Sequence, residues 1–550
     1  MKRLSGGEAV VRVMVKEGTK KAFCVPGESY LGVINALYDH SDIQLIAARH
    51  EGGASFMAEA YAKTSGDVGV CMATRGPGAS NLAIGLHTAM QDSTPLVALI
   101  GQVERSFKEK EAFQEVNFSG LFSHLCKWAV EIDRVERIPE LLHRAFHIAR
   151  SGRPGPVVVS LPHDMLEDTA EFVEQKPYYV GASNPDEKSV DEALKEIAKA
   201  KRPVLIAGGG VTISKSTSLL IKFAEAMHIP VVTAFRRFSA FPNTHPCYAG
   251  WLGFGTPSSL LGYIKNADLV IALGTRFSQV TTQDYSLLAD DARLIHIDIS
   301  PDTIGKVYAP MLPIVADVKQ FLIKALERIP QMRDVERKKL ITELHKRYRE
   351  FSSIKADYSL DYVDLDGMMY DLVNKLPKDA IVTSDAGNFF GWLSRYYRFE
   401  QENSYIGPTS GAMGYGLPAA IGAKVARPDK TVISFSGDGG FMMTMQELET
   451  AVREKIPVIS IVVNNNMYGT IRAHQEKHFP DRVIATELTN PNFAELARLF
   501  GAHGERVEKN EDFIPALERA MFSGSPAVIE VMTNPAILSV NQPKEIAERL

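Results

Sequence analysis

The sequence contains few cysteines and tryptophans and no long run of apolar residues. Its 550 residues include three tryptophans and four cysteines. The cysteines show no metal-type spacing, so we expect free thiols and a reducing, cytoplasmic location. No segment approaches the roughly 18 apolar residues that a membrane-spanning helix needs, and the N-terminus lacks the apolar core of a secretion signal. These absences argue against a disulfide scaffold, a cysteine metal site and an integral membrane protein.

Neither sign of charge dominates the composition. The chain has 61 Lys and Arg against 66 Asp and Glu, with a formal net charge of −5 and no basic cluster. Binding of nucleic acid is therefore not expected. Apolar residues make up 45% and charged residues 23%, as in globular proteins. A chain of this length favours about three domains.

Three blocks of alternating apolar strands and amphipathic helices are separated by two polar stretches. The pattern predicts an α/β protein with three doubly wound parallel-sheet domains, at residues 1–165, 189–330 and 361–545. The charged segment that follows the first block is interpreted as a linker, and the first residues of the chain as an amphipathic helix. Ligands of such sheets bind at the carboxyl ends of the strands, so functional residues are expected there.

The third block contains a strand, a glycine-rich turn, a helix and a second strand. The first strand, residues 431–435, is followed by Gly437-Asp438-Gly439-Gly440, a helix is expected at 441–453, and the second strand ends at Asn465. Glycines at a strand end let the backbone approach a phosphate, and the next helix directs N–H groups toward it. Asp438 and Asn465 then offer a carboxylate and an amide oxygen, which suit Mg²⁺ in the presence of phosphate. An ordinary α/β turn with a buried Asp is the alternative.

This arrangement closely resembles the signature of thiamine diphosphate enzymes, in which Gly-Asp-Gly is followed one strand later by Asn-Asn. The resemblance implies thiamine diphosphate and Mg²⁺ as cofactors. It also implies that Asp438 and Asn465 are metal ligands, together with the backbone carbonyl of Met467.

A second glycine-crowded turn, at residues 410–420, carries one large flexible apolar side chain, Met413. This composition suggests a backbone pressed against a flat ligand, with Met413 as a wedge; a helix start with a core methionine is the alternative. In enzymes that the chain resembles, such a residue bends the cofactor, and the carbonyl of Gly411 accepts a hydrogen bond from its amino group. Further cofactor contacts are expected from Pro26, Gly27, Pro77, Asn81, Gln114, Asn388, Gly437, Gly439, Gly440 and Tyr468.

Glu51 lies where a strand of the first block enters a helix. A glutamate at this position is commonly a favourable charge at a helix N-terminus. The resemblance instead implies a catalytic role, in which Glu51 contacts the pyrimidine ring of the cofactor and relays a proton to it. Glu51 and Asp438 belong to different blocks. In the family the two halves of a site come from different subunits, which implies a homodimer or homotetramer.

The resemblance covers nearly the whole chain and is nearest to the acetohydroxyacid (acetolactate) synthase large-subunit branch. The strings Arg75-Gly76-Pro77-Gly78 and Gly414-Tyr415-Gly416-Leu417-Pro418 support this placement. It implies an N-terminal pyrimidine-binding domain, a central domain and a C-terminal diphosphate-binding domain. In the synthases the central domain holds FAD without a redox role in turnover. The corresponding contacts here would be Gly208, Gly209, Gly210, Arg276, Asp298 and Asp317, although ADP or an empty domain fits these residues too.

Three positions depart from the biosynthetic synthases. His474 stands where those enzymes carry a Trp, Phe254 replaces a Met, and Glu104 follows Gly-Gln-Val where a Pro is usual. These positions face the acceptor substrate in the synthases, so His474 and Phe254 are expected to alter acceptor specificity. A position of His474 in solvent is the alternative.

The predicted activity is decarboxylation of a 2-oxo acid, pyruvate in the leading interpretation, followed by carboligation to a second carbonyl compound. A 2-oxo acid decarboxylase is less favoured because the first block has no His-His pair. A pyruvate oxidase-like enzyme stays possible on sequence grounds. A non-catalytic subunit is disfavoured because Glu51, Asp438, Asn465 and Met413 are all present.

Overall fold

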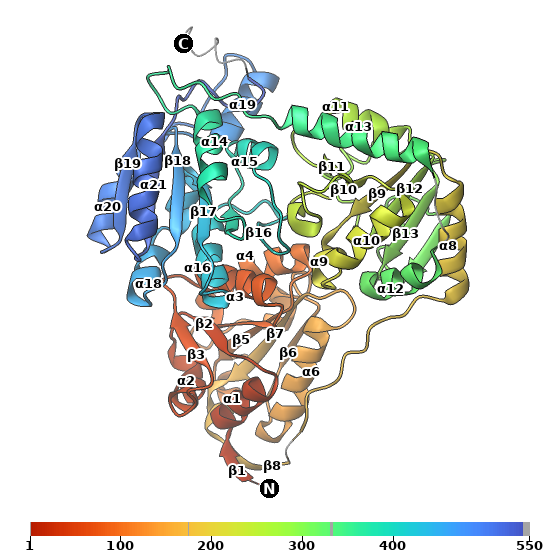
Figure 1. Cartoon of the computed structure of the whole chain (residues 1–550). Coiled ribbons are helices and arrows are strands. Elements are labelled where there is room, and N and C mark those ends of the chain that lie inside the picture. Colours follow the sequence, from red (N-terminus) through yellow and green to blue (C-terminus); the bar gives the residue numbers. More distant parts are fainter. Residues whose placement is uncertain (1, 174, 330–333, 543–550) are drawn as a thin grey trace.

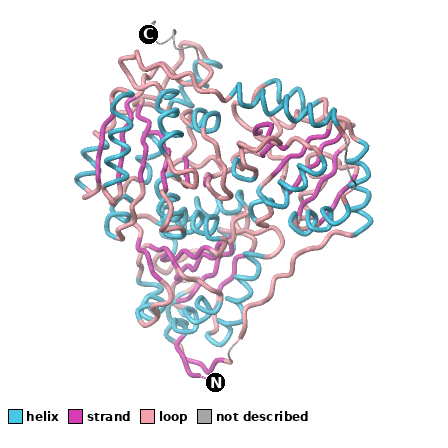
Figure 2. The backbone as a smooth tube through the Cα atoms, viewed as in Figure 1, coloured by secondary structure: helices cyan, strands magenta, loops and turns pink. Residues whose placement is uncertain are grey.

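Three parallel β-sheets of six strands each organise the molecule (Figures 1 and 2). The computed structural model describes residues 2–173, 175–329 and 334–542. Each sheet is flanked by helices, and each lies within one of the three predicted ranges. The α/β fold class is therefore confirmed. The domain boundaries stay predictions, and residues 1, 330 and 543–545 of those ranges lie outside the described residues.

The first sheet has the strand order β3-β2-β4-β5-β7-β6. Its inner strands β4, β5 and β7 are buried on both faces, as expected for parallel strands that helices cover on each side. Along β4, Cys71 and Ala73 face one hydrophobic cluster, whereas Val70 and Met72 face another. The strands are β2 (Lys21–Cys24), β3 (Gln44–Ala47), β4 (Gly69–Thr74), β5 (Leu96–Gln102), β6 (Trp128–Glu131) and β7 (Pro156–Pro162). The helices are α1 (Gly6–Lys16), α2 (Leu31–Tyr38), α3 (Glu51–Ser65), α4 (Arg75–Asp92), α5 (Phe118–Leu121), α6 (Ile138–Arg150) and α7 (His163–Glu167).

The central sheet has the order β11-β10-β9-β12-β13-β14, the arrangement of dinucleotide-binding folds. The order reverses between β9 and β12, which is where such folds bind their ligands. Its strands are β9 (Pro203–Ala207), β10 (Val231–Thr233), β11 (Tyr248–Trp251), β12 (Leu269–Leu273), β13 (Leu294–Asp298) and β14 (Leu312–Val315). Its helices are α8 (Glu187–Lys199), α9 (Gly209–Ile213), α10 (Thr217–Met227), α11 (Ser258–Lys265), α12 (Val318–Arg328) and α13 (Val335–Phe351).

The third sheet has the order β16-β15-β17-β18-β20-β19. When strands are counted from one within each domain, the first and third sheets share the order 2-1-3-4-6-5. The architectural likeness of these two blocks is thus present in their topology. The strands are β15 (Ile381–Ser384), β16 (Tyr405–Ile406), β17 (Val432–Gly437), β18 (Ile459–Asn464), β19 (His503–Val507) and β20 (Ala527–Met532). The helices are α14 (Leu365–Lys375), α15 (Phe390–Tyr396), α16 (Gly416–Ala426), α17 (Asp438–Thr444), α18 (Glu447–Arg453), α19 (Gly469–His478), α20 (Phe493–Leu499) and α21 (Phe513–Phe522).

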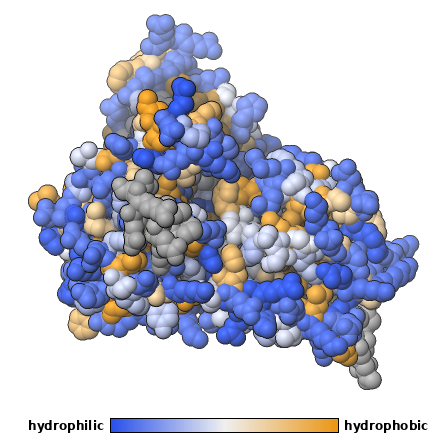
Figure 3. Space-filling model, turned by 90° about the horizontal axis from the view of Figure 1, so that it is seen from above, coloured by the Kyte–Doolittle hydropathy of each residue, from blue (hydrophilic) through white to orange (hydrophobic). Residues whose placement is uncertain are grey.

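Hydrophobic clusters continue from one domain into the next. Helix α16 of the third domain packs along α3 of the first, where the ring of Tyr415 meets that of Phe56 edge-on at 5.2 Å. Phe238 of the central domain stacks on Phe399 at 5.5 Å. The outer face seen in Figure 3 is mostly hydrophilic, with hydrophobic side chains in scattered groups. Among the described helices, none combines the length and apolarity needed to cross a membrane.

The structure corrects three local predictions. Within the described residues, strand β1 (Lys2–Ser5) precedes α1, where only a helix was predicted. Strand β8 (Thr169–Phe172) lies inside the segment interpreted as a linker and pairs antiparallel with β1. Neither strand could be predicted from its local sequence, because each is only four residues long and its partner is distant in sequence. The helix expected at 441–453 is divided into α17 and α18, which are separated by Met445 and Gln446.

Candidate functional site

A cavity of about 220 Å³ lies at the carboxyl ends of β15, β17 and β18. This is the edge at which parallel sheets bind ligands. The wall includes residues from several separate segments of the third domain. Those that the sequence had singled out are Asn388, Gly411, Met413, Gly437, Asp438, Gly439, Gly440, Asn465, Met467 and Tyr468.

The glycines of this wall are required by close approaches of neighbouring groups. A Cβ atom at Gly439 would lie 2.6 Å from Cε1 of Tyr468, and one at Gly440 would lie 2.7 Å from Oδ2 of Asp385. Gly411 has a φ of +71°, in the left-handed region that glycine adopts without strain. These glycines therefore let neighbouring groups pack closely at the strand ends, and they leave their part of the cavity wall without side chains.

Asp438 is the first residue of α17 and is buried. Its Oδ2 accepts a hydrogen bond from Nδ2 of Asn490 at 2.7 Å, and the same amide group also donates to Oδ1 of Asn464 at 3.0 Å. Burial raises the pKa of Asp438, against the effect of the Asn490 hydrogen bond. A bound cation would favour the charged form. Sequence analysis missed Asn490, because it lies in a loop outside the recognised motifs.

The cavity wall also carries a donor that no protein group uses. Nδ2 of Asn388 is buried without a hydrogen-bond partner among the described residues, although its Oδ1 accepts from the hydroxyl of Thr470 at 2.6 Å. Unsatisfied buried donors are uncommon in native proteins and mark a place for a ligand or water. Asn388, Asp438, Asn465 and the backbone at Met467 therefore provide the oxygen and nitrogen groups that a phosphate with a hard cation would need.

The residues predicted in the first domain gather at the carboxyl edge of its own sheet. Glu51 begins α3 and is 9% exposed, and its Oε2 accepts a hydrogen bond from Nδ2 of Asn81 at 2.9 Å. A Cβ at Gly78 would lie 3.1 Å from Oε1 of Glu51, which places the start of α4, and so the neighbouring Pro77, beside the carboxylate. A Cβ at Gly27 would meet Cβ of Thr74 at 2.4 Å, so the turn that holds Pro26 and Gly27 lies against the end of β4.

Gln114 lies in the loop that covers the start of α4. Its φ is +65°, and its carbonyl accepts the N–H of Gly76 at 3.0 Å. Like Glu51, Pro26, Gly27, Pro77 and Asn81, it is not among the residues that line the 220 Å³ cavity of the same chain. The predicted cofactor residues thus form two groups in the described chain, one on each outer domain.

The two residues linked to acceptor specificity lie outside the lining of this cavity. His474 is exposed on α19, with its ring stacked on that of His478 at 6.1 Å. From this part of the chain, Thr470 and Ile471 line the cavity instead. Phe254 is 65% exposed and meets the ring of Phe235 edge-on at 5.5 Å. Their role in specificity stays a prediction.

A larger cavity of about 860 Å³ opens above the carboxyl ends of the central strands. The predicted residues that line it are Gly209, Gly210, Arg276, Asp298 and Asp317. Gly208 lies next to them, where a Cβ would approach the carbonyl oxygen of Gly274 to 2.2 Å. The glycines therefore allow the β9–α9 turn to pack closely against the end of β12. This packing requires them whether or not a nucleotide binds.

The larger cavity is lined by five cationic and four acidic side chains. Arg276 donates to the backbone carbonyl of Gln91, and its pKa is lowered to about 10 by burial. Burial also raises the pKa of Asp298 to about 6. The sequence analysis missed Arg153 and Lys127, which come from the first domain and join this wall only in the folded chain. Such a wall suits an elongated anionic ligand.

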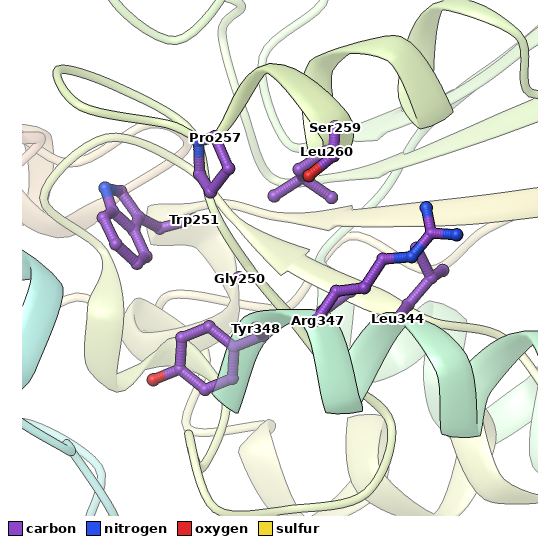
Figure 4. Close-up of a pocket in the computed structure, with 9 residues that line it drawn as sticks. Gly250, Trp251, Pro257, Ser259, Leu260, Leu344, Arg347 and Tyr348 are labelled. Atoms are coloured by element: carbon purple, nitrogen blue, oxygen red, sulfur yellow. The ribbon is translucent and has the colours of Figure 1, made fainter. Parts of the chain in front are cut away.

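A third pocket, between α11, β11 and α13, is too small for a substrate (Figure 4). Its volume of about 20 Å³ has room for about one water molecule. Trp251, Leu260, Leu344 and Tyr348 supply much of its lining, and Arg347 of α13 borders it. We assign it no function.

Comparisons with known proteins identify the family of the chain. Three family models match the chain in order: "Thiamine pyrophosphate enzyme, N-terminal TPP binding domain" at residues 4–121, "central domain" at 190–325, and "C-terminal TPP binding domain" at 385–531. A probable acetolactate synthase large subunit of Methanocaldococcus jannaschii is 35% identical, over 97% of this chain and 92% of the relative.

Two bacterial relatives show similar coverage. The acetolactate synthase large subunit of Corynebacterium glutamicum is 35% identical over 96% of this chain and 86% of its own length. The acetolactate synthase isozyme 2 large subunit of Escherichia coli is 33% identical over 96% and 95%. The chain therefore belongs to the thiamine pyrophosphate enzyme family, as a thiamine diphosphate-dependent enzyme related to acetolactate synthase large subunits.

Proposed function

We propose that this enzyme decarboxylates pyruvate and joins the remaining two-carbon fragment to a second carbonyl compound, as an acetolactate synthase does. The observation that carries the proposal is the 220 Å³ cavity, which brings ten predicted cofactor residues together at the ends of three strands. The names of the relatives support the reaction class.

Mg²⁺ and the diphosphate of the cofactor would bind on the wall of this cavity. The carboxylate of Asp438, the amide oxygen of Asn465 and the backbone carbonyl of Met467 are the proposed metal ligands, with phosphate oxygens completing the shell. The free Nδ2 of Asn388 supports the fit, because it offers a donor to an anionic group. When bound, thiamine diphosphate supplies the carbanion stabilisation that loss of carbon dioxide requires.

Glu51 is the proposed catalytic proton carrier. The Asn81 amide holds one of its oxygens, and the other lies beside Gly78 at the start of α4. A glutamate held in this way is positioned to transfer a proton to a pyrimidine nitrogen that contacts it. Met413, on the wall of the C-terminal cavity, is positioned to press against the body of the cofactor.

A homodimer or homotetramer is proposed as the active form. Its support is that Glu51 does not line the Asp438 cavity of the same chain, and that none of the lining residues of that cavity comes from the described first domain. Pairing of two copies, each offering its Glu51 edge to the partner's cavity, would complete two equivalent sites.

The 860 Å³ cavity is proposed to hold FAD, with ADP as the second candidate. Its volume and the arginine and lysine side chains of its wall support an elongated anionic nucleotide. Arg276 would bind phosphate or ribose oxygens through its guanidinium fork. Absorbance of the purified protein near the flavin band, together with identification of any nucleotide released on denaturation, tests this assignment. Colourless protein that releases no nucleotide would reject it.

The central experiment measures products from pyruvate. Purified enzyme with Mg²⁺ and thiamine diphosphate should release carbon dioxide and form a carboligation product, with 2-oxobutyrate and aldehydes tested as competing acceptors. Free acetaldehyde as the main product would indicate a simple decarboxylase. Turnover that requires an electron acceptor would indicate a pyruvate oxidase-like enzyme.

A further inference from the structure

Glu447 is a buried carboxylate of the third domain that contacts the first domain next to Glu51. It begins α18 and is fully buried. Its Oε1 accepts the backbone N–H of His50 at 3.0 Å, and its Oε2 accepts the N–H of Arg49 at 3.1 Å. The hydroxyl of Thr450 donates to Oε2 at 2.8 Å. The carboxylate therefore binds the two residues that immediately precede Glu51.

Helix α18 holds the same segment at a second point. Arg453, in its last turn, donates to the backbone carbonyl of Ala47 at the end of β3. Only Ala48, Arg49 and His50 then separate β3 from α3. A Cβ at Gly53 would lie 2.3 Å from Oε1 of Glu447, so the first turn of α3 leaves the space that the carboxylate fills.

Stability alone does not explain a glutamate at this position. Burial raises the pKa of Glu447 to about 7, against the hydrogen bonds from Thr450, Arg49 and His50. A buried carboxylate without a cationic partner is costly compared with an uncharged side chain of the same size. What the carboxylate provides is two acceptor oxygens, which one amide oxygen cannot replace.

We propose that Glu447 is a positioning residue that fixes the turn before α3 and thereby the direction in which Glu51 projects. The inference rests on the proposed proton-transfer role of Glu51. Displacing a reacting group by about 1 Å can cost about 100-fold in rate, so a small shift of this turn would be visible in turnover. Helix α17, which begins with Asp438, directly precedes α18, which begins with Glu447. The hydrogen bonds of Glu447 therefore also connect the segment that contains Asp438 to the segment that contains Glu51.

The test compares Glu447→Gln with wild type in the full-length enzyme. The amide keeps the size of the side chain but turns an N–H₂ group toward one of the two backbone N–H donors. We expect kcat with pyruvate to fall about 10- to 100-fold, while KM and the affinity for Mg²⁺ and thiamine diphosphate change by less than about threefold. Exchange of the C2 proton of bound thiamine diphosphate, followed by NMR after acid quench, should slow in parallel. The melting temperature at about pH 8 should not fall, because the substitution removes a buried charge.

Matched variants make the outcome decisive. Glu495→Gln makes the same chemical change at an exposed site of the third domain and should behave as wild type. If Glu447→Gln does not fold, Glu447→Asp, which retains the charge but withdraws it by one methylene, is used with the same expectations for kcat and exchange. Normal C2 exchange in the folded variant, or a loss of activity explained wholly by weaker cofactor binding, would overturn the inference.

Glu51→Gln is measured alongside to separate the two claims. If Glu51→Gln retains normal exchange, the proposed role of Glu51 fails and the positioning role fails with it. If Glu51→Gln loses exchange and Glu447→Gln does not, only the positioning role fails.

Discussion

At the residue scale, Asp385 is a buried carboxylate beside Gly440, which lines the 220 Å³ cavity. Its Oδ1 accepts the N–H of Gly416 at 2.7 Å. Its Oδ2 has no hydrogen-bond partner among the described residues. Burial raises its pKa to about 6, an effect that the hydrogen bond from the N–H of Gly416 and, more weakly, the charge of Arg236 oppose. Arg236 itself donates to the backbone carbonyl of Asp385 at 2.9 Å.

Asp385→Asn should therefore change the pH dependence of stability. The folded protein binds the Asp385 proton more tightly than the unfolded chain, whose carboxyl titrates near pH 4. Ionised Asp385 therefore lowers the free energy of unfolding. This loss grows between about pH 4 and pH 6 and reaches its full value of about 3 kcal/mol above that range. The melting temperature of the variant relative to wild type should rise as the pH is raised from about 4.5 to about 7.5. A difference that stays constant with pH would contradict the assignment.

Asp438→Ala tests the metal site. The substitution removes the charged ligand from a cation that requires near-ideal octahedral oxygen coordination. Loss of even a supporting contact around a metal typically costs about 10- to 100-fold in affinity, so loss of a direct ligand should cost more than about 100-fold. Calorimetric titration of the metal-free protein with Mg²⁺ and thiamine diphosphate measures this. Unchanged binding would refute Asp438 as a ligand.

His474→Trp tests the predicted control of acceptor choice. A Trp side chain in the acceptor site would favour an acceptor with one extra methylene by about 1–3 kcal/mol, and the smaller, polar His should favour it less. The measurement is the ratio of products when pyruvate and 2-oxobutyrate compete. We expect the Trp variant to shift toward the 2-oxobutyrate product. Equal ratios in the two proteins would show that the exposed position of His474 leaves it outside the acceptor site.

At the scale of elements, the contact between α3 and α16 joins the first domain to the third. The backbones of the two helices approach closely at Gly422, where a Cβ would lie 2.2 Å from the carbonyl oxygen of Met57. The ring of Phe56, on α3, meets that of Tyr415 beside the same contact. This packing places α3, and so its first residue Glu51, against the third domain.

Gly422→Ala should separate these two helices. The methyl group meets rigid backbone rather than a flexible side chain, so we expect a loss of about 1–3 kcal/mol or more in stability and a lower melting temperature. Gly262→Ala is the control, because Gly262 is exposed in α11 and a Cβ there meets nothing within 4 Å. That change should raise stability by about 0.5–1 kcal/mol through helix propensity alone. Similar effects of both changes would contradict the packing argument.

At the scale of the whole molecule, Asp92 connects all three domains. It ends α4, and its carboxylate accepts from Nζ of Lys63 at 2.9 Å, from Nη2 of the central Arg237 at 2.7 Å and from the N–H of Thr409 at 3.2 Å. Burial alone would raise the pKa of Asp92, but the charges of Lys63 and Arg237 outweigh it and the pKa is lowered. This charged junction thus contributes to the mutual orientation of all three domains, beside the hydrophobic contacts between them.

Asp92→Ala should weaken the attachment of the domains to one another. Removing the Asp92 carboxylate takes from Arg237 its ion-pair partner and leaves Lys63 with Glu59 alone. Loss of one partner of a buried ion pair typically costs about 3–5 kcal/mol. Melting temperature and the rate of limited proteolysis between the first and central domains report the change. Asp191→Ala, which removes an exposed partner of Arg328, is the control and should cost less than about 1 kcal/mol. Equal sensitivity to protease in the two variants would show that Asp92 does not hold the domains together.

Short-range patterns in the sequence were enough to predict the class of the fold, and together with the family resemblance they predicted ten of the 21 residues that line the 220 Å³ cavity. Strand β12 occupies the predicted residues Leu269–Leu273, since a short apolar run between polar segments forms a strand that helices bury on both faces. The spacing of Gly437, Asp438 and Asn465 places them together because consecutive parallel strands end at the same edge of a sheet.

Tertiary structure alone decided which distant groups meet. The pairing of β1 with β8, the contact of Asn490 with Asp438 and the contact of Glu447 with Arg49 and His50 all join segments far apart in sequence. Local periodicity carries no information on such contacts, because their formation depends on how complete domains pack. The absence of Glu51 from the lining of the Asp438 cavity of the same chain is likewise known only from the folded structure, because the sequence does not place one domain against another.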